Sequence, residues 1–190
     1  MDADDIRRIA RESAALQERF FTENAERLLE VGRQLARSVL AGGRVLAFGN
    51  GGSAAHAQHL AAELVARFER ERRAFSALSL ASDPSVVSAV GNDMGFAAVF
   101  RRQVEAHGRS GDVAFGISTS GRSPNVVEAL RAARDRGLVT VGLTGNGGGD
   151  VAGVVDHLVD VPHPSTARIQ EVHSVVVHVL CQIVEEAATR

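Results

Sequence analysis

The sequence RVLAFGNGGS, at residues 44–53, is a short apolar strand that leads directly into a glycine-rich turn. The same order returns in VAFGISTSG at residues 113–121 and in VTVGLTGNG at residues 139–147. Weaker apolar strands are expected at residues 75–80 and 157–161. Strands that alternate with helices through such turns predict a parallel sheet covered on both faces. The sequence therefore predicts a doubly wound α/β fold, with a five-stranded parallel sheet flanked by helices.

Helical patterns fill the segments between these strands, at residues 54–70, at 84–106 with an interruption at 92–95, at 124–136 and at 166–187. Ahead of the first strand, residues 1–41 carry apolar side chains at helical spacing, and we expect one or two helices there rather than a single rigid rod. We find no repeat, low-complexity tract or linker. Residues 1–190 are therefore expected to form a single domain, with N-terminal helices at 1–41 and the α/β core and C-terminal helix at 42–190.

The composition excludes several classes of function. The formal net charge is only −2, and the chain contains no tyrosine or tryptophan, so we expect no nucleic-acid partner. All 21 basic residues are arginine, which excludes a lysine Schiff base and a Walker-type phosphate loop. No apolar run is long enough for a membrane span, and the acidic N-terminus is not a signal peptide. With Cys181 as the single cysteine, a cytoplasmic location is expected.

Two loops follow the first and third strands, where ligands of open parallel sheets bind. The first, GNGGS at residues 49–53, allows close backbone approach to a polar ligand, although a plain tight turn explains it equally well. The second, STSGRSPN at residues 118–125, places four hydroxyls in six residues ahead of a helix. Capping that helix by one serine is the simpler alternative. Because one cap needs one hydroxyl and not four, we interpret this loop as a phosphate-binding site.

Titratable side chains with metal-ligand or acid–base chemistry lie on two of the predicted helices. His59 and Glu63 are four residues apart and share a helix face, which Arg67 continues one turn later. Such a pair can hold a divalent metal or place a carboxylate base beside an imidazole, but an ordinary surface pair is the commoner case. We leave both possibilities open at this point.

The last helix carries Gln170, Glu171, His173 and His178 among valines and leucines. A histidine in such an apolar run is usually a hydrogen-bonded core residue. At about 100° per residue, Glu171 and His178 align within roughly 20°, whereas Gln170 and His178 differ by about 80°. Helical geometry alone therefore does not choose between Gln170 and Glu171 as a partner of His178.

Taken together, these residues resemble the phosphoheptose isomerase family of sugar-isomerase (SIS) domains. The resemblance covers nearly the whole chain and rests on FGNGGS at 48–53 with His59 and Glu63, VGND at 90–93, GISTSG at 116–121, LTG at 143–145 and RIQEVH at 168–173. Members of that family are homotetramers that interconvert sedoheptulose 7-phosphate and D-glycero-D-manno-heptose 7-phosphate, the entry step to bacterial heptose nucleotides.

The resemblance implies a set of site residues by position. It implies one zinc ion per subunit, bound by His59, Glu63, Gln170 and His178. It implies that Glu63 and His178 form the acid–base pair. It further implies that a phosphorylated heptose is bound by Asn50, Gly51, Gly52, Ser53, Glu63, Asn92, Asp93, Ser118, Thr119, Ser120, Ser123 and Gln170.

These residue types suit an aldose–ketose isomerisation. Moving a carbonyl from C2 to C1 requires a base for a carbon proton, which a carboxylate such as Glu63 can supply, while a histidine serves the oxygens. Zinc stabilises enediolate oxygens as a Lewis acid. Two positions depart from the family pattern. His56 stands where many members have aspartate, and Ala167 stands where some have an acidic residue.

Two other functions compete with catalysis. The first is a non-catalytic adaptor of the same fold that binds the replication initiator. That relative is expected to have serine and asparagine where this chain has Glu63 and His178, so the presence of both residues favours the isomerase. The second is a sugar-phosphate-sensing or hexose-phosphate isomerase member of the wider class, which the serine-rich loop fits but the GNGGS loop fits less well.

Overall fold

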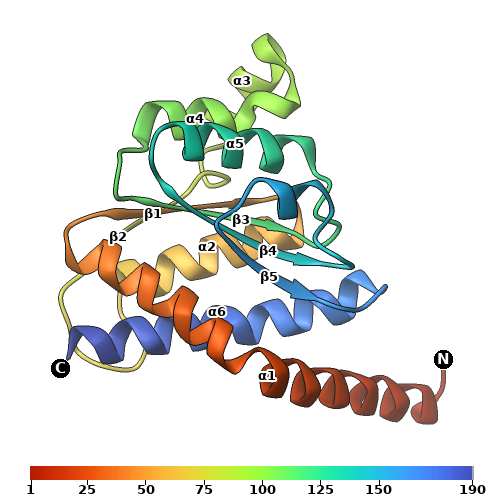
Figure 1. The fold of residues 1–190 in the computed structure, drawn as a ribbon. Helices are drawn as coiled ribbons and strands as arrows, with labels where there is room; N and C mark the ends of the chain where they lie inside the picture. The colour runs from red at the N-terminus through yellow and green to blue at the C-terminus, as the bar shows by residue number, and fades with distance from the viewer. Residues whose placement is uncertain (190) are drawn as a thin grey trace.

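A five-stranded parallel sheet forms the centre of the computed structural model, in which residues 1–189 are described (Figure 1). The strands are β1 (Arg44–Gly49), β2 (Ser76–Ser79), β3 (Val113–Ser118), β4 (Val139–Gly145) and β5 (His157–Val161). All neighbouring strands pair in parallel. The predicted five-stranded parallel sheet is thus confirmed, and the strand bounds at 113–118 and 157–161 are those expected.

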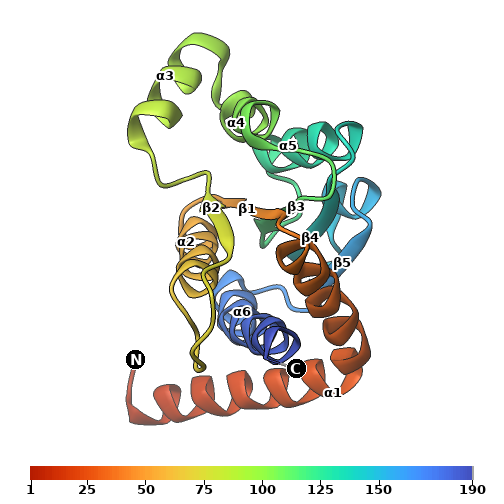
Figure 2. The same cartoon turned by 90° about the vertical axis from the view of Figure 1, so that its left-hand side faces the viewer.

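The helices are α1 (Ala3–Leu40), α2 (Gly52–Val65), α3 (Pro84–Met94), α4 (Val99–His107), α5 (Pro124–Asp135) and α6 (Thr166–Ala188), with two short 3₁₀ turns at Phe96–Ala98 and Gly149–Gly153. Helices α4 and α5 cover one face of the sheet, while α1, α2 and α6 cover the other (Figures 1 and 2). Alternate strand residues feed the two cores: Ala47 and Phe115 pack with α2 and α6, and Phe48 and Ala114 with α4 and α5. Both faces are therefore buried, as a parallel sheet requires.

The strand order β2-β1-β3-β4-β5 reverses between β1 and β3. The chain leaves β1 through α2 toward one edge of the sheet, and leaves β3 through α5 toward the other edge. The two connections therefore diverge at the carboxyl ends of neighbouring strands, and the space between them is where ligands of doubly wound folds bind. The two loops singled out in the sequence follow these two strands.

Helix α1 is one continuous helix of 38 residues, which agrees with the expectation of one or two helices within residues 1–41. The helix is not a straight rod, because its ribbon bends about halfway along (Figure 2). In this middle part Thr22 Oγ1 donates to the carbonyl of Glu18, and Asn24 Nδ2 donates to that of Phe20. Side chains that bond a carbonyl four residues back commonly bend helices.

Helix α2 ends at Val65 rather than at the expected residue 70. Arg67 therefore lies beyond the helix and does not continue the face of His59 and Glu63, which corrects the prediction. It pairs instead with Glu71 at 3.3 Å in an exposed loop. None of the helices in residues 1–189 combines the length and apolar character that crossing a membrane needs. The cytoplasmic location stays a prediction.

Candidate active site

A reciprocal amide pair joins the loops after β1 and β3. Asn50 Nδ2 donates to Asn125 Oδ1 at 2.9 Å, and Asn125 Nδ2 donates to Asn50 Oδ1 at 2.8 Å. Asn125 is buried in the first turn of α5, and sequence reasoning did not assign it to the site. Its only sequence signal was its position at the end of the serine-rich loop. The pair holds the two loops at a fixed distance from each other.

The helices that follow these loops begin without side-chain caps. Gly51 is the N-cap of α2 and Ser123 the N-cap of α5, and neither forms a side-chain capping hydrogen bond. The serine hydroxyls contact each other instead, with Ser118 Oγ 3.0 Å from Ser123 Oγ and 3.5 Å from Ser120 Oγ. Capping of α5 by one serine is therefore wrong. Hydroxyls and uncapped N–H groups at two helix starts favour an anion such as a phosphate group.

The turn after β4 fixes the shape of the serine-rich loop. Gly121 has φ of +62°, and a Cβ atom there would lie 2.0 Å from the carbonyl oxygen of Gly148. The N–H of Val151 also donates to the carbonyl of Gly121 at 2.9 Å. Only glycine satisfies both the backbone conformation and this approach. The residues Ser118, Thr119 and Ser120 are thus held on a backbone that two loops build together.

Helices α2 and α6 run parallel, and polar residues of the two helices meet at successive turns. A Cβ on Gly52 would lie 2.5 Å from Gln170 Nε2, and one turn further His56 Nε2 lies 2.8 Å from Ser174 Oγ. These contacts continue to His59 and His178. We call these six residues the α2–α6 seam. It leads from the carboxyl end of β1 along the face of the sheet that α2 and α6 cover.

The structure distinguishes Gln170 from Glu171. Gln170 lies against Gly52, and the missing side chain at that glycine leaves room for its amide. Glu171 is turned away, with Oε1 2.5 Å from Nη2 of Arg168, whose Nη1 also donates to the carbonyl of Ile9 in α1. The residue that helical spacing favoured for alignment with His178 is therefore engaged in a structural ion pair.

At the far end of the seam, His59 and His178 lie together with Glu63, and all three side chains have acid–base or ligand chemistry. His59 Nε2 is 3.1 Å from Glu63 Oε1 and 3.3 Å from Nε2 of His178. The rings of His59 and His178 meet edge to face at 4.9 Å between centroids. The site is open to solvent, since the His59 side chain is 37% exposed and that of Glu63 24%. A substrate can therefore reach these groups without a large opening of the fold.

These distances suit a zinc ion. Around tetrahedral zinc with bonds of about 2.0–2.1 Å, neighbouring donor atoms are about 3.3–3.4 Å apart, close to both separations at His59. Two imidazoles and a carboxylate are also donors that zinc prefers. Within residues 1–189, however, no group of three or more histidine, cysteine, aspartate or glutamate side chains is arranged to hold a metal ion by itself. The amide of Gln170, the further ligand expected from the resemblance, lies against Gly52, about two helical turns from His178.

His173 differs from His178. It is fully buried, its Nε2 donates to the carbonyl of Thr144 at 2.9 Å, and burial lowers its pKa to about 4. The interpretation as a hydrogen-bonded core histidine is therefore correct for His173, whereas His178 is exposed. Burial, and next the charge of His59, also lower the pKa of His56. Both His56 and His173 are accordingly neutral near pH 7.

Asn92 and Asp93 lie apart from the loops and the seam. Both are on α3, an outlying helix with no buried residues, at the top of Figures 1 and 2. Both are exposed, and Asn92 Nδ2 donates to Asp93 Oδ1 at 2.8 Å. The structure thus brings together His59, Glu63 and His178 and joins the two loops, but it does not bring Asn92 or Asp93 into contact with them.

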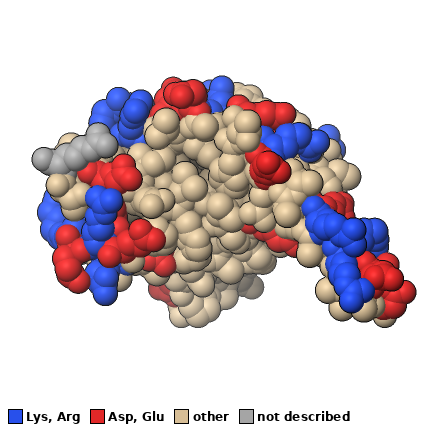
Figure 3. Space-filling view, turned by 90° about the horizontal axis from the view of Figure 1, so that it is seen from below, with Lys and Arg blue, Asp and Glu red and all other residues tan. Residues whose placement is uncertain are grey.

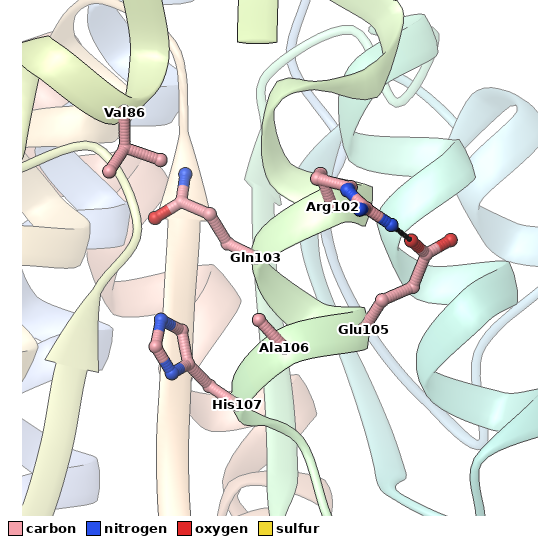
Figure 4. Close-up of a pocket in the computed structure, with 6 residues that line it drawn as sticks. All are labelled: Val86, Arg102, Gln103, Glu105, Ala106 and His107. Carbon is pink, nitrogen blue, oxygen red and sulfur yellow. Dashed lines mark hydrogen bonds and ion pairs between the residues drawn. The ribbon is translucent and has the colours of Figure 1, made fainter. Parts of the chain in front are cut away.

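A separate hollow of about 330 Å³ lies between α3 and α4 (Figure 4). Three of its polar side chains are already paired: Gln103 Nε2 donates to the carbonyls of Leu80 and Val99, and Arg102 pairs with Glu105. None of the predicted site residues lines it. We attribute this hollow to the loose packing of α3 and not to catalysis.

Comparison with known proteins places this fold and site in context. The model of the SIS domain family matches residues 10–145. The phosphoheptose isomerase of Nitratidesulfovibrio vulgaris (strain DSM 19637 / Miyazaki F) is 52% identical over 176 residues, which are 93% of this chain and 85% of that protein. These matches include the two loops and most of the core.

Solved structures agree in both sequence and fold. The phosphoheptose isomerase of Neisseria gonorrhoeae superposes with a TM-score of 0.91 and 40% identity, over 96% of this chain and 98% of that one. That of Francisella tularensis superposes with a TM-score of 0.94 and 33% identity, over 98% of this chain and 100% of the other.

Proposed function

This chain belongs to the phosphoheptose isomerase family of SIS-domain proteins, and on that premise we propose that it interconverts sedoheptulose 7-phosphate and D-glycero-D-manno-heptose 7-phosphate. The observation that carries the proposal is the meeting of Glu63, His59 and His178, which contact one another in that order at 3.1 and 3.3 Å. They lie on two helices that start at the ligand end of the sheet. A family member without catalytic function would not need an accessible carboxylate beside two imidazoles.

The loops bind the substrate in this proposal. The serine-rich loop and the start of α5 hold the phosphate group through hydroxyls and backbone N–H groups, which do not require lysine. The first loop and the exposed residues of α3 contact the sugar. The proposed substrate-binding residues are Asn50, Gly51, Gly52, Ser53, Glu63, Asn92, Asp93, Ser118, Thr119, Ser120, Ser123 and Gln170.

Proton transfer uses Glu63 together with the seam residues His59 and His178. Glu63 removes the proton from one of the two carbons, C1 or C2, and returns it to the other, so that the carbonyl moves through an enediol. His178 exchanges the proton between the two oxygens, a task that suits an imidazole near neutral pH. His59 lies between these two groups and orients both of them through contacts of 3.1 and 3.3 Å. The carbon and oxygen protons are thereby handled by separate side chains.

We propose one zinc ion per subunit as the cofactor, held by His59, Glu63, Gln170 and His178. Bound there, zinc would supply Lewis-acid stabilisation of negative charge on the substrate oxygens. The donor types and the separations at His59 support the proposal. The carboxylate of Glu63 would then have to serve both as ligand and as base.

A homotetramer is the proposed assembly. An apolar groove of about 380 Å³ runs between α1 and α6, and Figure 3 shows the uncharged centre of this face within a rim of charged side chains. Its lining residues include Phe21, Leu29, Val179 and Ile183. An exposed apolar surface with a polar rim is typical of an interface between protein chains. We also propose that residues 1–190 fold as one domain, since α1 and α6 share a core with the sheet.

The adaptor and sensor functions remain the alternatives. A sugar-phosphate sensor would bind the substrate through the same loops without turnover. The accessible pair of Glu63 and His178 favours catalysis over both alternatives, because neither function requires proton transfer.

Turnover of sedoheptulose 7-phosphate by zinc-loaded protein tests the proposal, with Glu63→Gln and His178→Ala as parallel variants. We expect conversion by the wild type and a loss of about 10²–10⁴-fold in kcat in each variant, the usual contribution of a general acid or base. Folded wild-type protein that binds the sugar phosphate without converting it would exclude the isomerase and favour the sensor.

A further inference from the structure

The loop between α2 and β2, residues 66–75, is fastened to α6 by one buried carboxylate. Glu185 Oε1 accepts from the N–H of Phe68 at 2.6 Å, and Oε2 accepts from those of Glu69 and Arg70 at 2.8 and 3.0 Å. Burial acts to raise the pKa of Glu185, but the three N–H groups and Arg72 together lower it. A carboxylate that receives three backbone donors is a strong local anchor.

The same carboxylate faces a buried arginine that reaches the end of α2. Arg72 Nε lies 3.2 Å from Glu185 Oε1, and both side chains are only 2% exposed. Arg72 Nη2 donates to the carbonyl of Glu63 at 2.7 Å, and Nη1 donates to that of Leu64 at 3.0 Å. A cation beside the last carbonyls of a helix also interacts favourably with the negative end of the helix dipole. Arg72 thus fixes the backbone turn that carries the Glu63 side chain.

The anchored loop places the aromatic ring of Phe68 against His178. The ring of Phe68, whose N–H is bound by Glu185, lies 5.4 Å from that of His178 between centroids, with the planes inclined by 35°. His178 also meets the ring of His59, edge to face. His178 is exposed, and the ring contacts that the described part of the chain gives it, with Phe68 and His59, restrict its orientation.

We propose that Glu185 and Arg72 are positioning residues for the reaction, which act on Glu63 through the backbone of α2 and on His178 through Phe68. The inference rests on the proposed function, in which Glu63 and His178 transfer the protons. One buried ion pair would then fix the positions of both Glu63 and His178, from the side opposite to the substrate loops.

A purely structural role is the competing explanation, because loss of either partner of a buried ion pair destabilises a protein. The chain offers a matched control. Asp112 is also buried and accepts from two backbone N–H groups, those of Arg44 and Arg109, at 2.8 and 3.0 Å. It lies at the amino ends of β1 and β3, opposite to the substrate loops, and its side chain bonds Arg44 and Arg109, neither of which is a proposed site residue. Asp112→Asn should therefore lower stability without changing catalysis.

The experiment compares Glu185→Gln, Phe68→Leu and Asp112→Asn with the wild type in two measurements. The first is kcat and KM for sedoheptulose 7-phosphate. We expect about a tenfold loss of kcat or more in the first two variants, with KM within about twofold of the wild type because the substrate loops are untouched. The second is the ring C–H shift of His178 in metal-free full-length protein with ¹³C-labelled histidine, assigned with His178→Ala. The Glu185→Gln variant retains Phe68. If its His178 signal moves toward the position seen in Phe68→Leu, the Phe68 ring has moved away from His178.

The outcomes separate the two proposals. If Glu185→Gln lowers Tm but keeps the wild-type kcat and His178 shift, as expected for Asp112→Asn, the positioning role is overturned. If Glu185→Gln does not fold, Phe68→Leu decides the question, and a wild-type kcat in that variant would equally overturn the positioning role. If the wild type does not convert the substrate, the proposed function fails, while the His178 shifts still show whether Glu185 positions that ring.

Discussion

The α2–α6 seam and helix α3 differ in how firmly the rest of the chain holds them. Along the seam, side chains from two parallel helices contact one another turn by turn, and a buried carboxylate anchors the adjoining loop. Helix α3 has no buried residue, and the Asn92 side chain donates to that of Asp93 on the same helix. The core of one chain therefore fixes the acid–base groups. Any contribution of α3 to the site must come from its movement or from another copy of the chain.

The largest effect we predict concerns the buried His173, whose ring meets that of the seam residue His56, and its response to acid. His173 has a pKa of about 4 in the folded protein, below the ordinary 6.5, so the unfolded chain binds more protons between these values. Stability is therefore lost as the pH falls from 6.5 through 4, by up to about 3 kcal/mol, and is unaffected above that window. Urea unfolding of the wild type and His173→Asn across this range measures it. If the free energy of unfolding changed equally with pH in the two proteins, the loss of stability could not be assigned to His173.

Gly52→Ala tests the contact between the seam and the first loop. The new Cβ would lie 2.5 Å from Gln170 Nε2 and would push the amide aside, but the end of a flexible side chain moves at little cost to stability. We expect kcat/KM to fall about a hundredfold with Tm nearly unchanged, because small displacements at a reacting centre reduce rates by this order. Steady-state kinetics and bound zinc content are the measurements. Wild-type kcat/KM would show that Gln170 has no part in the site.

Asn92→Ala and Asp93→Ala test whether helix α3 takes part in the site. Both residues are exposed, so each substitution should change the free energy of unfolding by less than about 0.5 kcal/mol. If α3 contacts the substrate during turnover, KM should rise about tenfold while kcat is retained. Kinetics with sedoheptulose 7-phosphate decide this, and an unchanged KM in both variants would remove α3 from the site.

Gly91→Ala gives the smallest effect and is the α3 counterpart of Gly52→Ala. Its Cβ would make an ordinary contact, 3.7 Å from Cγ1 of Val99, so nothing has to move. Alanine is the better helix former, and we expect the protein to gain up to about 1 kcal/mol of stability. Thermal unfolding measures the gain. A loss of stability would show that α3 packs more tightly than the structure indicates.

The sequence predicted the strands well because they are short, mostly apolar runs, four of which (β1 to β4) end in glycine or serine. The bounds of β3 and β5 are those expected, and the reversal of strand order places the two loops side by side as predicted. The end of α2 was missed by five residues, since it falls at Val65 and not at residue 70. No proline or glycine marks it, and the helix stops where long-range contacts of Glu185 and Arg72 hold the following loop.

Side-chain partners across the fold were the part that could not be predicted. Helical spacing favoured Glu171 beside His178, yet the tertiary contact with Arg168 turns Glu171 away. Asn125 pairs with Asn50 over 75 positions, and nothing local distinguishes it from an ordinary first-turn residue. Local pattern gives the helix on which a residue lies, but the neighbouring element decides what that residue contacts.

The parallel register of α2 and α6 limits how this protein can evolve. Positions 52, 56 and 59 on one helix meet 170, 174 and 178 on the other. One residue inserted within α6 between 170 and 185 would rotate everything beyond it by about 100° and separate all later pairs at once. Length changes should therefore be absent from this stretch among working descendants, which can diverge here only by substitution. The loop at residues 66–75 can change length wherever its anchoring N–H groups are kept.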